Sequence, residues 1–304
     1  MELIFLGTSA GVPTRERNVS AVALRPEQRR GWYLFDCGEG TQHRILRSEL
    51  SLYRLEKIFV THLHGDHIYG IFGLLASRGM LMADSPLEIY GPPGLRELLE
   101  VVLRISRLRL PFELAVRELK GEERLELEAF SLRVLPLSHS ITSYGYCCIE
   151  PERSGHFLPE RARGLGIPEG PLWGRLKGGE PVTVEGKAIT PEMVMGPSRP
   201  GRRIAIAGDN DRPELFASCA PLDMLVHEAT YLQEDFDRLP RKFKHTTALQ
   251  LGKAASSIGV RHLVATHFSP RYDTQGDLRR IEKEIRENYE GKLTLAEDLM
   301  KLKL

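Results

Sequence analysis

Three histidines and an aspartate stand within six residues of one another in the heptapeptide THLHGDH. His62 and His64 are two positions apart, so in extended backbone both imidazole rings point to the same side. Gly65 permits a sharp turn, after which Asp66 and His67 can face a second point. Imidazole nitrogens and carboxylate oxygens suit zinc, and ligand softness alone also allows manganese or iron. The heptapeptide therefore predicts part of a metal site with two centres.

Further candidate ligands follow apolar runs elsewhere in the chain. They are His139 in LPLSHS, Asp209 in IAIAGDND and His267 in LVATHFSP. Because the ligands of an α/β site gather beyond the carboxyl ends of its strands, these residues are candidates to complete the site. A single histidine after a strand is more often structural, and a histidine-rich surface loop is the alternative for the heptapeptide. The recurrence of the pattern favours the metal site.

The elements that must hold these residues are predicted to form a sheet with crossovers. In the first ninety residues, β-branched or aromatic runs such as LIFLG, GWYLFDCG and KIFVTH alternate with turn residues and two helix-like segments. The heptapeptide then lies on a loop between a strand and a helix. Strand-like runs near 125–137 and in RRIAIAGD, DMLVHEAT and HLVATHF complete an α/β pattern, with helices expected over 92–106, 246–258 and 277–288.

The segment 150–203 interrupts this pattern, because 18 of its 54 residues are glycine or proline. The whole chain has 28 Gly and 19 Pro, so 47 − 18 = 29 fall in the other 250 residues. A packed sheet does not tolerate that density of turn residues. A linker between two domains is the alternative, but the flanking halves share one pattern and the segment keeps Leu172, Trp173 and Leu176. We therefore expect a single domain over 1–304 with an inserted flexible arm at 150–203.

The composition is that of a globular protein of 304 residues, 41% of them hydrophobic. The most apolar stretch, 68–83, is broken by three glycines and an arginine and is shorter than the roughly 20 apolar residues of a membrane span. With no visible export signal, we expect a cytoplasmic protein without membrane attachment. The net charge of +1 neither indicates nor excludes nucleic acid.

Four cysteines include an adjacent pair and show no metal-type CxxC spacing. We therefore expect reduced thiols that serve as small core residues, not a disulfide framework. They are Cys37, Cys147, Cys148 and Cys219.

The HxHxDH motif with His, Asp and His at later strand ends resembles the metallo-β-lactamase superfamily of dinuclear metal hydrolases. More narrowly, FLGTSAGVPTRERN, FDCGEGTQ, GPLWGRLKGG, HEAT, HTT and THFSPRY resemble the ribonuclease Z family of tRNA 3′-processing endonucleases, over essentially the whole chain. The resemblance implies a four-layer αβ/βα sandwich with the metals at one sheet edge and a protruding Gly/Pro-rich arm. It also implies a homodimer. Asn210 departs from the pattern, since a threonine is expected after the aspartate.

The resemblance implies two Zn²⁺ per subunit, with Mn²⁺ or Co²⁺ able to substitute. Paired metals about 3.5 to 4 Å apart can activate a water as nucleophile and neutralise a phosphate together. By resemblance, Asp66 is also the general base. The implied ligands are His62, His64 and His139 for one metal and Asp66, His67 and His267 for the other, with Asp209 bridging.

His245 in FKHTT is not needed as a ligand once those seven are assigned. A histidine that merely flanks a helix is the alternative, but a catalytic role is favoured, in which His245 contacts the scissile phosphate or donates to the departing 3′ oxygen. Glu228 in VHEAT can hydrogen-bond that imidazole and raise its pKa. His227 is equally compatible with a core position.

Two groups of residues are candidates for contact with an RNA backbone. Arg15, Arg17 and Asn18 in PTRERN form a solvated face by default, and the resemblance favours substrate contact. Arg271 offers paired donors that suit a phosphate, and a salt bridge is an equal alternative.

The insertion GIPEGPLWGRLKGGE resembles a tRNA-gripping arm. Its glycines allow backbone amides near phosphates, Arg175 and Lys177 add charge, and Trp173 can pack the arm's own base. Gly170 and Pro171 belong to the same predicted contact surface. Recognition of a folded RNA by shape fits this arm better than recognition of sequence.

The predicted function is a zinc-dependent endoribonuclease that removes the 3′ trailer from precursor tRNA. It would leave a 3′-hydroxyl on the tRNA and a 5′-phosphate on the trailer, by attack of a metal-activated hydroxide. The alternatives are a hydrolase for small substrates, either a thioesterase or a phosphodiesterase, and a metal-bound RNA-binding scaffold without activity. The presence of both Asp66 and Asp209 argues against the scaffold.

Overall fold

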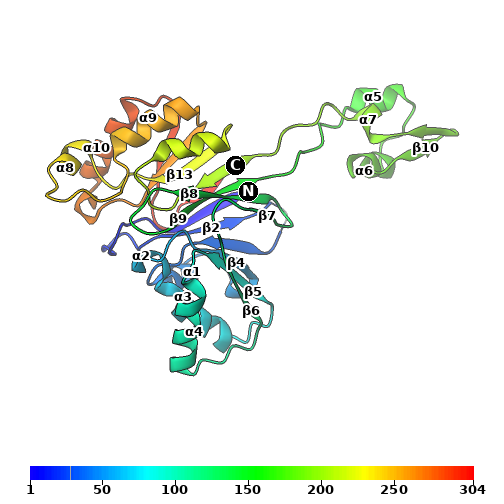
Figure 1. Ribbon diagram of the computed structural model, residues 1–304. Helices are drawn as coiled ribbons and strands as arrows, with labels where there is room; N and C mark the ends of the chain where they lie inside the picture. Colours follow the sequence, from blue (N-terminus) through cyan, green and yellow to red (C-terminus); the bar gives the residue numbers. More distant parts are fainter. Residues whose placement is uncertain (28) are drawn as a thin grey trace. The chain divides into compact units, whose positions relative to one another are not determined.

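The computed structural model describes residues 1–27 and 29–304, and Figure 1 labels its helices and strands. These residues divide into two compact units. The first unit combines Met1–Cys148 with Arg203–Leu304, and the second is Ile149–Arg202. The strands of the predicted α/β pattern on both sides of the insertion thus belong to one unit.

The first unit contains two sheets of seven strands each. One sheet has the order β16-β1-β2-β3-β4-β5-β6, and its strands β3 to β6 run parallel. The other has the order β15-β14-β13-β12-β9-β8-β7, and its strands β12 to β15 run parallel. The first sheet comprises β1 (Glu2–Gly7), β2 (Ala21–Arg25), β3 (Trp32–Phe35), β4 (Leu55–Phe59), β5 (Leu87–Gly91), β6 (Leu114–Glu118) and β16 (Lys301–Lys303). The second comprises β7 (Arg124–Glu126), β8 (Ser131–Leu137), β9 (Ser143–Ile149), β12 (Arg203–Ile206), β13 (Met224–Glu228), β14 (His262–Thr266) and β15 (Lys292–Leu295).

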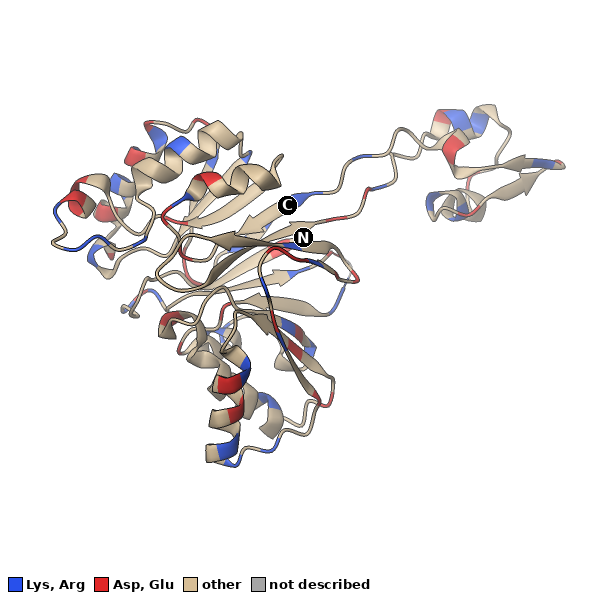
Figure 2. Cartoon of the chain, viewed as in Figure 1, with Lys and Arg blue, Asp and Glu red and all other residues tan. Residues whose placement is uncertain are grey.

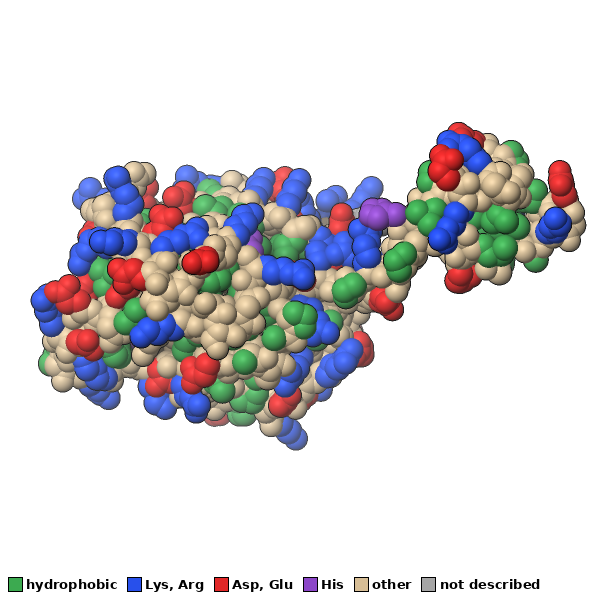
Figure 3. All heavy atoms as spheres, turned by 90° about the horizontal axis from the view of Figure 1, so that it is seen from above, with side chains coloured by type: hydrophobic (Ala, Val, Ile, Leu, Met, Phe, Trp, Pro, Cys, Tyr) green, Lys and Arg blue, Asp and Glu red, His purple; other side chains and the backbone are tan. Residues whose placement is uncertain are grey.

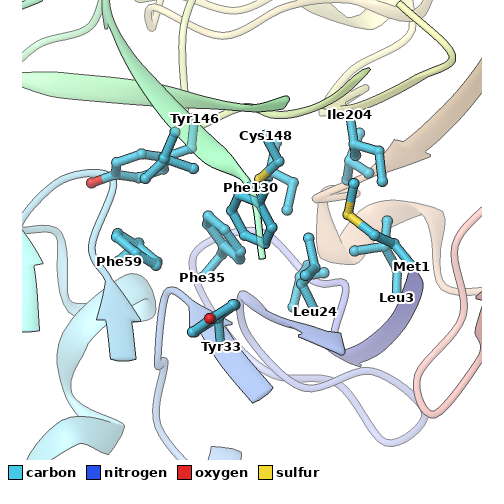
Figure 4. Packing of buried hydrophobic residues seen from close by; sticks show 14 of the residues in the cluster. Met1, Leu3, Leu24, Tyr33, Phe35, Phe59, Phe130, Tyr146, Cys148 and Ile204 are labelled. Carbon is cyan, nitrogen blue, oxygen red and sulfur yellow. The ribbon is translucent and has the colours of Figure 1, made fainter. Parts of the chain in front are cut away.

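The two sheets pack face to face over an aromatic core. Figure 4 shows Phe35 and Phe59 facing Tyr146, and the ring centroids of these pairs are 5.6 and 5.5 Å apart. In β1, Leu3 and Phe5 enter this core, whereas the alternate residues Ile4 and Leu6 pack on the opposite face. Both faces of the sheet are therefore buried, which explains why its strands read as nearly continuous apolar runs.

Helices cover the outer face of each sheet, so the first unit has four layers, as predicted. The helix expected over 92–106 begins at Leu95, because Gly94 before it has a left-handed φ of 95°. On the first sheet lie α1 (Thr41–Leu46), α3 (Gly70–Met80) and α4 (Leu95–Ser106). On the second lie η2 (Pro213–Cys219), α9 (Ala248–Ile258) and α10 (Gln275–Arg286). The remaining short helices are η1 (Leu52–Arg54), α2 (Gly65–Ile68), α8 (Gln233–Asp237) and η3 (Pro270–Tyr272).

The expectation of four reduced cysteines is wrong for one pair. Cys147 on β9 and Cys219 at the end of η2 form a disulfide, with their Cα atoms 6.6 Å apart. The sequence separation of 72 gives no sign that η2 packs against this sheet. Cys37 is a free thiol, and all four cysteines are buried, as a core role requires.

The second unit has a small core of its own, made by a hairpin and three short helices. Each of these helices begins at a proline, where the missing N–H costs nothing, so part of the high proline content specifies helix starts. The elements are α5 (Pro159–Gly164), α6 (Pro171–Lys177), β10 (Val182–Val184), β11 (Lys187–Ile189) and α7 (Pro191–Val194). Among the described residues of both units, none of the helices has the length and apolar character needed to span a bilayer.

Candidate active site

The seven predicted ligands come together beyond the ends of strands from both sheets. His62 and His64 follow β4, His139 follows β8, Asp209 follows β12, and His267 follows β14. Asp66 and His67 lie in the single turn of α2, directly after His64. Because parallel strands present their carboxyl ends at one sheet edge, residues more than 200 positions apart in sequence share one site.

Two clusters of ligand atoms lie side by side. In the first, the Nδ1 atom of His64 is 3.1 Å from Nε2 of His62 and 3.3 Å from Nε2 of His139. In the second, the Oδ2 atom of Asp66 is 3.4 Å from Nε2 of both His67 and His267. Within each cluster, the ligand atoms lie within 4.8 Å of one another.

Asp209 joins the two clusters. Its Oδ1 atom lies 3.5 Å from Nε2 of His67 and 3.4 Å from Nε2 of His267, while Oδ2 lies 3.8 Å from Nε2 of His62. Each carboxylate oxygen therefore faces a different cluster, the arrangement a bridging ligand requires.

The donor atoms fit bound metal ions. The Nε2 atom of His67 is buried, has no hydrogen-bond partner among the described residues, and faces two carboxylates. Leaving such a group unpaired costs about 1 to 3 kcal/mol unless another species satisfies it. Burial, then the neighbouring imidazoles, holds the pKa of His62 well below its ordinary value, and a ligating imidazole must be neutral.

The electrostatic field of the second cluster also favours a cation. Burial opposes charge on His67, but the carboxylates of Asp209, Asp36 and Asp66 outweigh it and raise the pKa of His67 well above its ordinary value. Burial likewise opposes charge on Asp66, yet His67 and His267 hold the pKa of that carboxyl below its ordinary range. Carboxylates that stay ionised in a buried site attract a divalent ion.

Four of the five candidate ligand imidazoles are oriented by a contact to the ring nitrogen that faces away from the cluster, as is usual for metal-binding histidines. The partners are Thr61 Oγ1 for His62 (3.0 Å), Asp36 Oδ2 for His67 (2.7 Å), the carbonyl of Lys244 for His139 (2.8 Å) and Thr230 Oγ1 for His267 (3.1 Å). None of these partners was predicted from the sequence. Asp36 carries the signal that identified the ligands, an acid directly after an apolar strand, whereas threonines and a backbone carbonyl carry no comparable signal.

His267 adopts a left-handed backbone conformation with a φ of 54°. This conformation costs a residue other than glycine on the order of 1 kcal/mol or more. The hydroxyl of Thr230 donates to the carbonyl of His267 at 3.0 Å, and the amide of Phe268 donates to the carbonyl of Thr8 at 3.0 Å. The structure therefore turns this imidazole toward the cluster at a local energetic cost.

The turn within the heptapeptide does not use the conformational freedom of Gly65. His64 is extended and α2 begins at Gly65 itself, whose φ is not positive. The predicted sharp turn is instead the ordinary entry into a helix. This correction leaves the division of ligands between two clusters unchanged.

The loop that leads into PTRERN reaches the site through the backbone of Gly11. The amide of Gly11 donates to Oδ2 of Asp66 at 2.8 Å. Arg17 is buried, and its guanidinium donates to Thr8 Oγ1 at 2.6 Å and to the carbonyl of Ala296 at 2.7 Å. The predicted contact of Arg17 with RNA is therefore wrong, because its donors point into the protein.

Asn18 has a similar structural role, which corrects its predicted contact with substrate. Its backbone amide donates to Oδ2 of Asp298 at 2.7 Å, and its side-chain amide donates to the carbonyl of Glu39 at 2.8 Å. Arg15 is exposed and remains a candidate for contact with substrate.

His245 and Glu228 form a buried pair beside the metal ligands. The Nδ1 atom of His245 lies 2.9 Å from Oε2 of Glu228 and 3.6 Å from Oδ2 of Asp209. Burial lowers the pKa of His245, but the Glu228 carboxylate outweighs it and raises that pKa to about 9. The pair can thus keep a protonated imidazole at neutral pH. His245 also lies within 4.8 Å of Asp209 and His267 and so has the position of a further ligand.

The backbone around His245 is fixed on its C-terminal side. Thr246 Oγ1 donates to the carbonyl of Asn210 at 2.6 Å. Thr247 is the N-cap of α9 and forms a capping box with Gln250. The sequence HTT therefore ends a loop and starts a helix at a defined point.

Asn210, the residue that departs from the family pattern, is fully engaged. Its backbone amide donates to Oε1 of Glu228 at 2.7 Å. Its side-chain nitrogen contacts the carbonyl of Gly208 and Nε2 of His227, both at 3.0 Å. His227 is buried and packs edge-on against Phe216, so it is a core residue.

Arg271 lies over the ring of Tyr231 at 5.3 Å, and that ring is 6.1 Å from the ring of His245. Among the described residues, Arg271 has no carboxylate within salt-bridge distance, so the salt-bridge alternative is wrong. Its exposed guanidinium is available for a phosphate.

The arm candidates belong to the second unit and are described within it. Gly170, with a φ of 134°, precedes Pro171 at the start of α6. Trp173 packs 5.0 Å from Phe157 and donates to the carbonyl of Ile167 at 3.2 Å. The remaining two candidates are exposed: Arg175 pairs with Glu180 at 3.1 Å, and Lys177 lies 4.9 Å over the ring of Phe157.

Comparison with known proteins identifies the family. Residues 1–152 match the family described as Anti-Pycsar protein Apyc1, so this half of the chain belongs to that family. A protein of Pseudomonas putida (strain GB-1) named Ribonuclease Z is 44% identical over 100% of this chain and 97% of its own length. The human tRNase Z, short form, superposes with a TM-score of 0.70 at 28% identity, covering 100% of this chain and 99% of that one.

A metallo-beta-lactamase fold protein, YhfI from Bacillus subtilis, shares the fold with a TM-score of 0.66 at 15% identity over 99% of this chain and 98% of its own. Because a relative is 44% identical over the full length and the candidate ligands gather beyond the ends of the strands, the chain belongs to the ribonuclease Z family of the metallo-β-lactamase fold.

Proposed function

We propose that this chain removes the 3′ trailer from precursor tRNA, leaving a 3′-hydroxyl on the tRNA and a 5′-phosphate on the trailer. As a member of the ribonuclease Z family, the chain is an endoribonuclease. The observation that carries the proposal is the pair of ligand clusters joined by Asp209 in a chain with relatives of that name over its full length.

We assign two zinc ions to the donor set, because imidazole nitrogens and carboxylate oxygens are ligands that zinc accepts. His62, His64 and His139 would hold one, Asp66, His67 and His267 the other, and Asp209 both. Bound there, such ions lower the pKa of a water toward about 7 and neutralise phosphate charge.

The chain's own residues then handle the protons. Asp66 is ionised and its Oδ2 atom is fixed by the Gly11 amide, so it can accept a proton from the attacking water. His245, kept protonated by Glu228, can give a proton to the departing 3′ oxygen. His245 faces Oδ2 of Asp209 at 3.6 Å, whereas Asp66 and Oδ1 of Asp209 both lie 3.4 Å from Nε2 of His267, so acid and base are both beside Asp209.

Recognition of precursor tRNA is assigned to the second unit, where Arg175 and Lys177 are exposed on α6 next to Gly170. On the face seen in Figure 3, Lys and Arg side chains are mixed with acidic ones, so the distribution of charge alone does not indicate where RNA would bind. Recognition by shape through a separately packed arm is compatible with that charge distribution.

A cytoplasmic homodimer is part of the same proposal. Tyr53, Met80, Leu81 and Met82 are exposed apolar residues, between 44% and 80% accessible. The Tyr53 hydroxyl donates to the carbonyl of Leu81, so part of this apolar surface is continuous. Surfaces of this kind mark protein interfaces, and a second copy of the chain is the proposed occupant. Light scattering on Met80→Glu against wild type tests the dimer.

The decisive experiment compares Asp66→Ala and an arm deletion on two substrates. The deletion replaces residues 151–201 with a short turn and keeps the paired Glu150 and Arg202, whose side chains lie 2.6 Å apart. We expect Asp66→Ala to lose cleavage of precursor tRNA and of a small phosphodiester alike. The deletion should lose only cleavage of tRNA. A folded Asp66→Ala enzyme that processed precursor tRNA at the wild-type rate would refute the proposed chemistry.

A hydrolase for small substrates is the second candidate. It is favoured by the match of residues 1–152 to a differently named family, since that half holds five of the seven ligands but little of the arm. If the arm deletion leaves tRNA cleavage intact, or removes both activities equally, the assigned role of the arm is wrong.

A further inference from the structure

The connection between α8 and α9 carries positive charge directly before His245. Its sequence over 238–244 is RLPRKFK, and Figure 2 shows the basic residues along it. Arg238 is neutralised by Glu234. In the described part of the chain, Arg241, Lys242 and Lys244 have no carboxylate partner. Three cations without a carboxylate partner therefore precede His245 in the sequence, and Lys242 among them donates to the carbonyl of Phe236.

The same connection exposes a phenylalanine. Phe243 is 47% accessible, although a ring of this size gains about 1.5 to 3 kcal/mol by full burial. The Arg241 guanidinium lies 5.9 Å from its ring centre, and the ring joins none of the apolar clusters of the first unit. Stability of the isolated chain does not explain its position.

The backbone fixes this segment to the catalytic residues. The carbonyl of Lys244 accepts a hydrogen bond from the metal-ligand candidate His139 at 2.8 Å. The amide of His245 donates to the carbonyl of Phe243 at 2.9 Å, so the chain turns tightly around Lys244. Since consecutive Cα atoms are about 3.8 Å apart, the Cα of Phe243 lies within about 7 Å of that of His245. The backbone of this exposed residue therefore lies next to His245.

An aromatic face flanked by free cations is the arrangement that binds single-stranded nucleic acid. Bases stack on the ring whatever their identity, and the cations follow the phosphates. An apolar protein surface would not require three uncompensated positive charges beside the ring. The chemistry therefore favours unpaired nucleotides as the occupant.

The direction of the reaction selects the nucleotide. In the proposed function, on which this step rests, His245 gives its proton to the 3′ oxygen that leaves, so the nucleotide bearing that oxygen lies on the His245 side. We propose that Phe243 stacks on the unpaired base at the 3′ end of the tRNA, immediately upstream of the cut. Arg241 and Lys244 hold the phosphates next to it.

Four precursor tRNAs test this assignment. They are the natural substrate, one with an abasic ribose at the last tRNA nucleotide, one with it at the first trailer nucleotide, and one with both. The variants are Phe243→Ala and Phe243→Trp, with Ile105→Ala as a control at another exposed apolar residue. KM and kcat are measured separately, with metal content and melting temperature as checks of folding.

We expect Phe243→Ala to raise KM for the natural substrate about tenfold, while Phe243→Trp and Ile105→Ala stay near wild type. The upstream abasic ribose should raise the wild-type KM by a similar factor and add nothing to Phe243→Ala. The assignment would be overturned if Phe243→Ala and the upstream abasic ribose had independent, multiplicative effects on KM, or if Phe243→Ala left KM unchanged. It would also be overturned if the effect of Phe243→Ala were coupled to the trailer-side abasic ribose instead. If the wild-type enzyme hydrolyses a small phosphodiester but leaves every precursor uncut, the proposed function itself has failed.

Discussion

Replacing Glu228 with glutamine tests the acid in the proposed mechanism. The substitution preserves volume in a fully enclosed position, where the carboxylate accepts from the Asn210 amide at 2.7 Å and faces His245 Nδ1 at 2.9 Å. It removes the negative charge that raises the pKa of His245 to about 9. Without that charge the pKa of His245 should fall toward its ordinary value of about 6.5, because burial depresses it and only the Asp209 carboxylate, 3.6 Å away, still raises it.

The magnitude follows from the fraction of protonated imidazole. In the wild type the raised pKa keeps His245 protonated until the pH passes about 9, whereas in Glu228→Gln the imidazole of His245 should lose its proton as the pH rises through about 6.5. At pH 8 the protonated fraction falls from about 0.9 to about 0.03, a rate loss of about 30-fold. At pH 6 both enzymes are mostly protonated, and the rates should differ by less than about twofold.

The assay is single-turnover cleavage of precursor tRNA between pH 5.5 and 9, with metal content measured for every preparation. Glu214→Gln, which changes an exposed glutamate paired with Arg212, is the matched control. A substrate with sulfur in place of the leaving 3′ oxygen needs no proton on departure, so it should restore the Glu228→Gln rate. A deficit that is equal at all pH values and persists with the sulfur substrate would refute the role of this pair.

Three further predictions concern stability and the metal site. Arg17→Met should lower the free energy of unfolding by about 3 kcal/mol in urea titrations, because Thr8 and the carbonyl of Ala296 lose a charged donor; an unchanged midpoint would contradict this. Burial, with Lys292 nearby, lowers the pKa of His262 to about 4, so stability should fall as the pH drops from about 6.5 to 4. His262→Gln should reduce that loss by on the order of 2 kcal/mol, and parallel pH profiles would argue against it. Chelation should lower the melting temperature of the wild type but not of His62→Ala with Asp209→Ala, and zinc should restore it.

The clustering of the seven candidate ligands could be predicted from the sequence, because their residue types and their positions after apolar runs indicate shared chemistry. His62, His64 and His267 each follow an apolar run. A purely structural role seldom explains imidazoles and carboxylates at the ends of several strands. The alternation of strands and helices was equally predictable, since buried strands and amphipathic helices have different periods, whereas the four layers were implied by the family resemblance.

The contacts that orient those ligands were not predictable. Thr61 and Thr230 are ordinary residues until the fold places them behind an imidazole. Arg17 looked like a surface cation because its partner Ala296 is 279 residues away and contributes only a carbonyl. A motif indicates which chemistry a residue is capable of, whereas the direction of its side chain depends on residues far along the chain.

The bond network of Asp298 has a consequence for when activity appears. Its carboxylate accepts from Thr8 Oγ1 at 2.8 Å and from the Asn18 amide at 2.7 Å, and β16 pairs with β1. The loop that supplies the Gly11 amide to Asp66 is thus held by residues translated 280 positions later than Asn18. During synthesis the metal ligands are all present before the loop can close. A nascent chain should therefore acquire its metals first and its full cleavage rate only after residues 298–303 have left the ribosome.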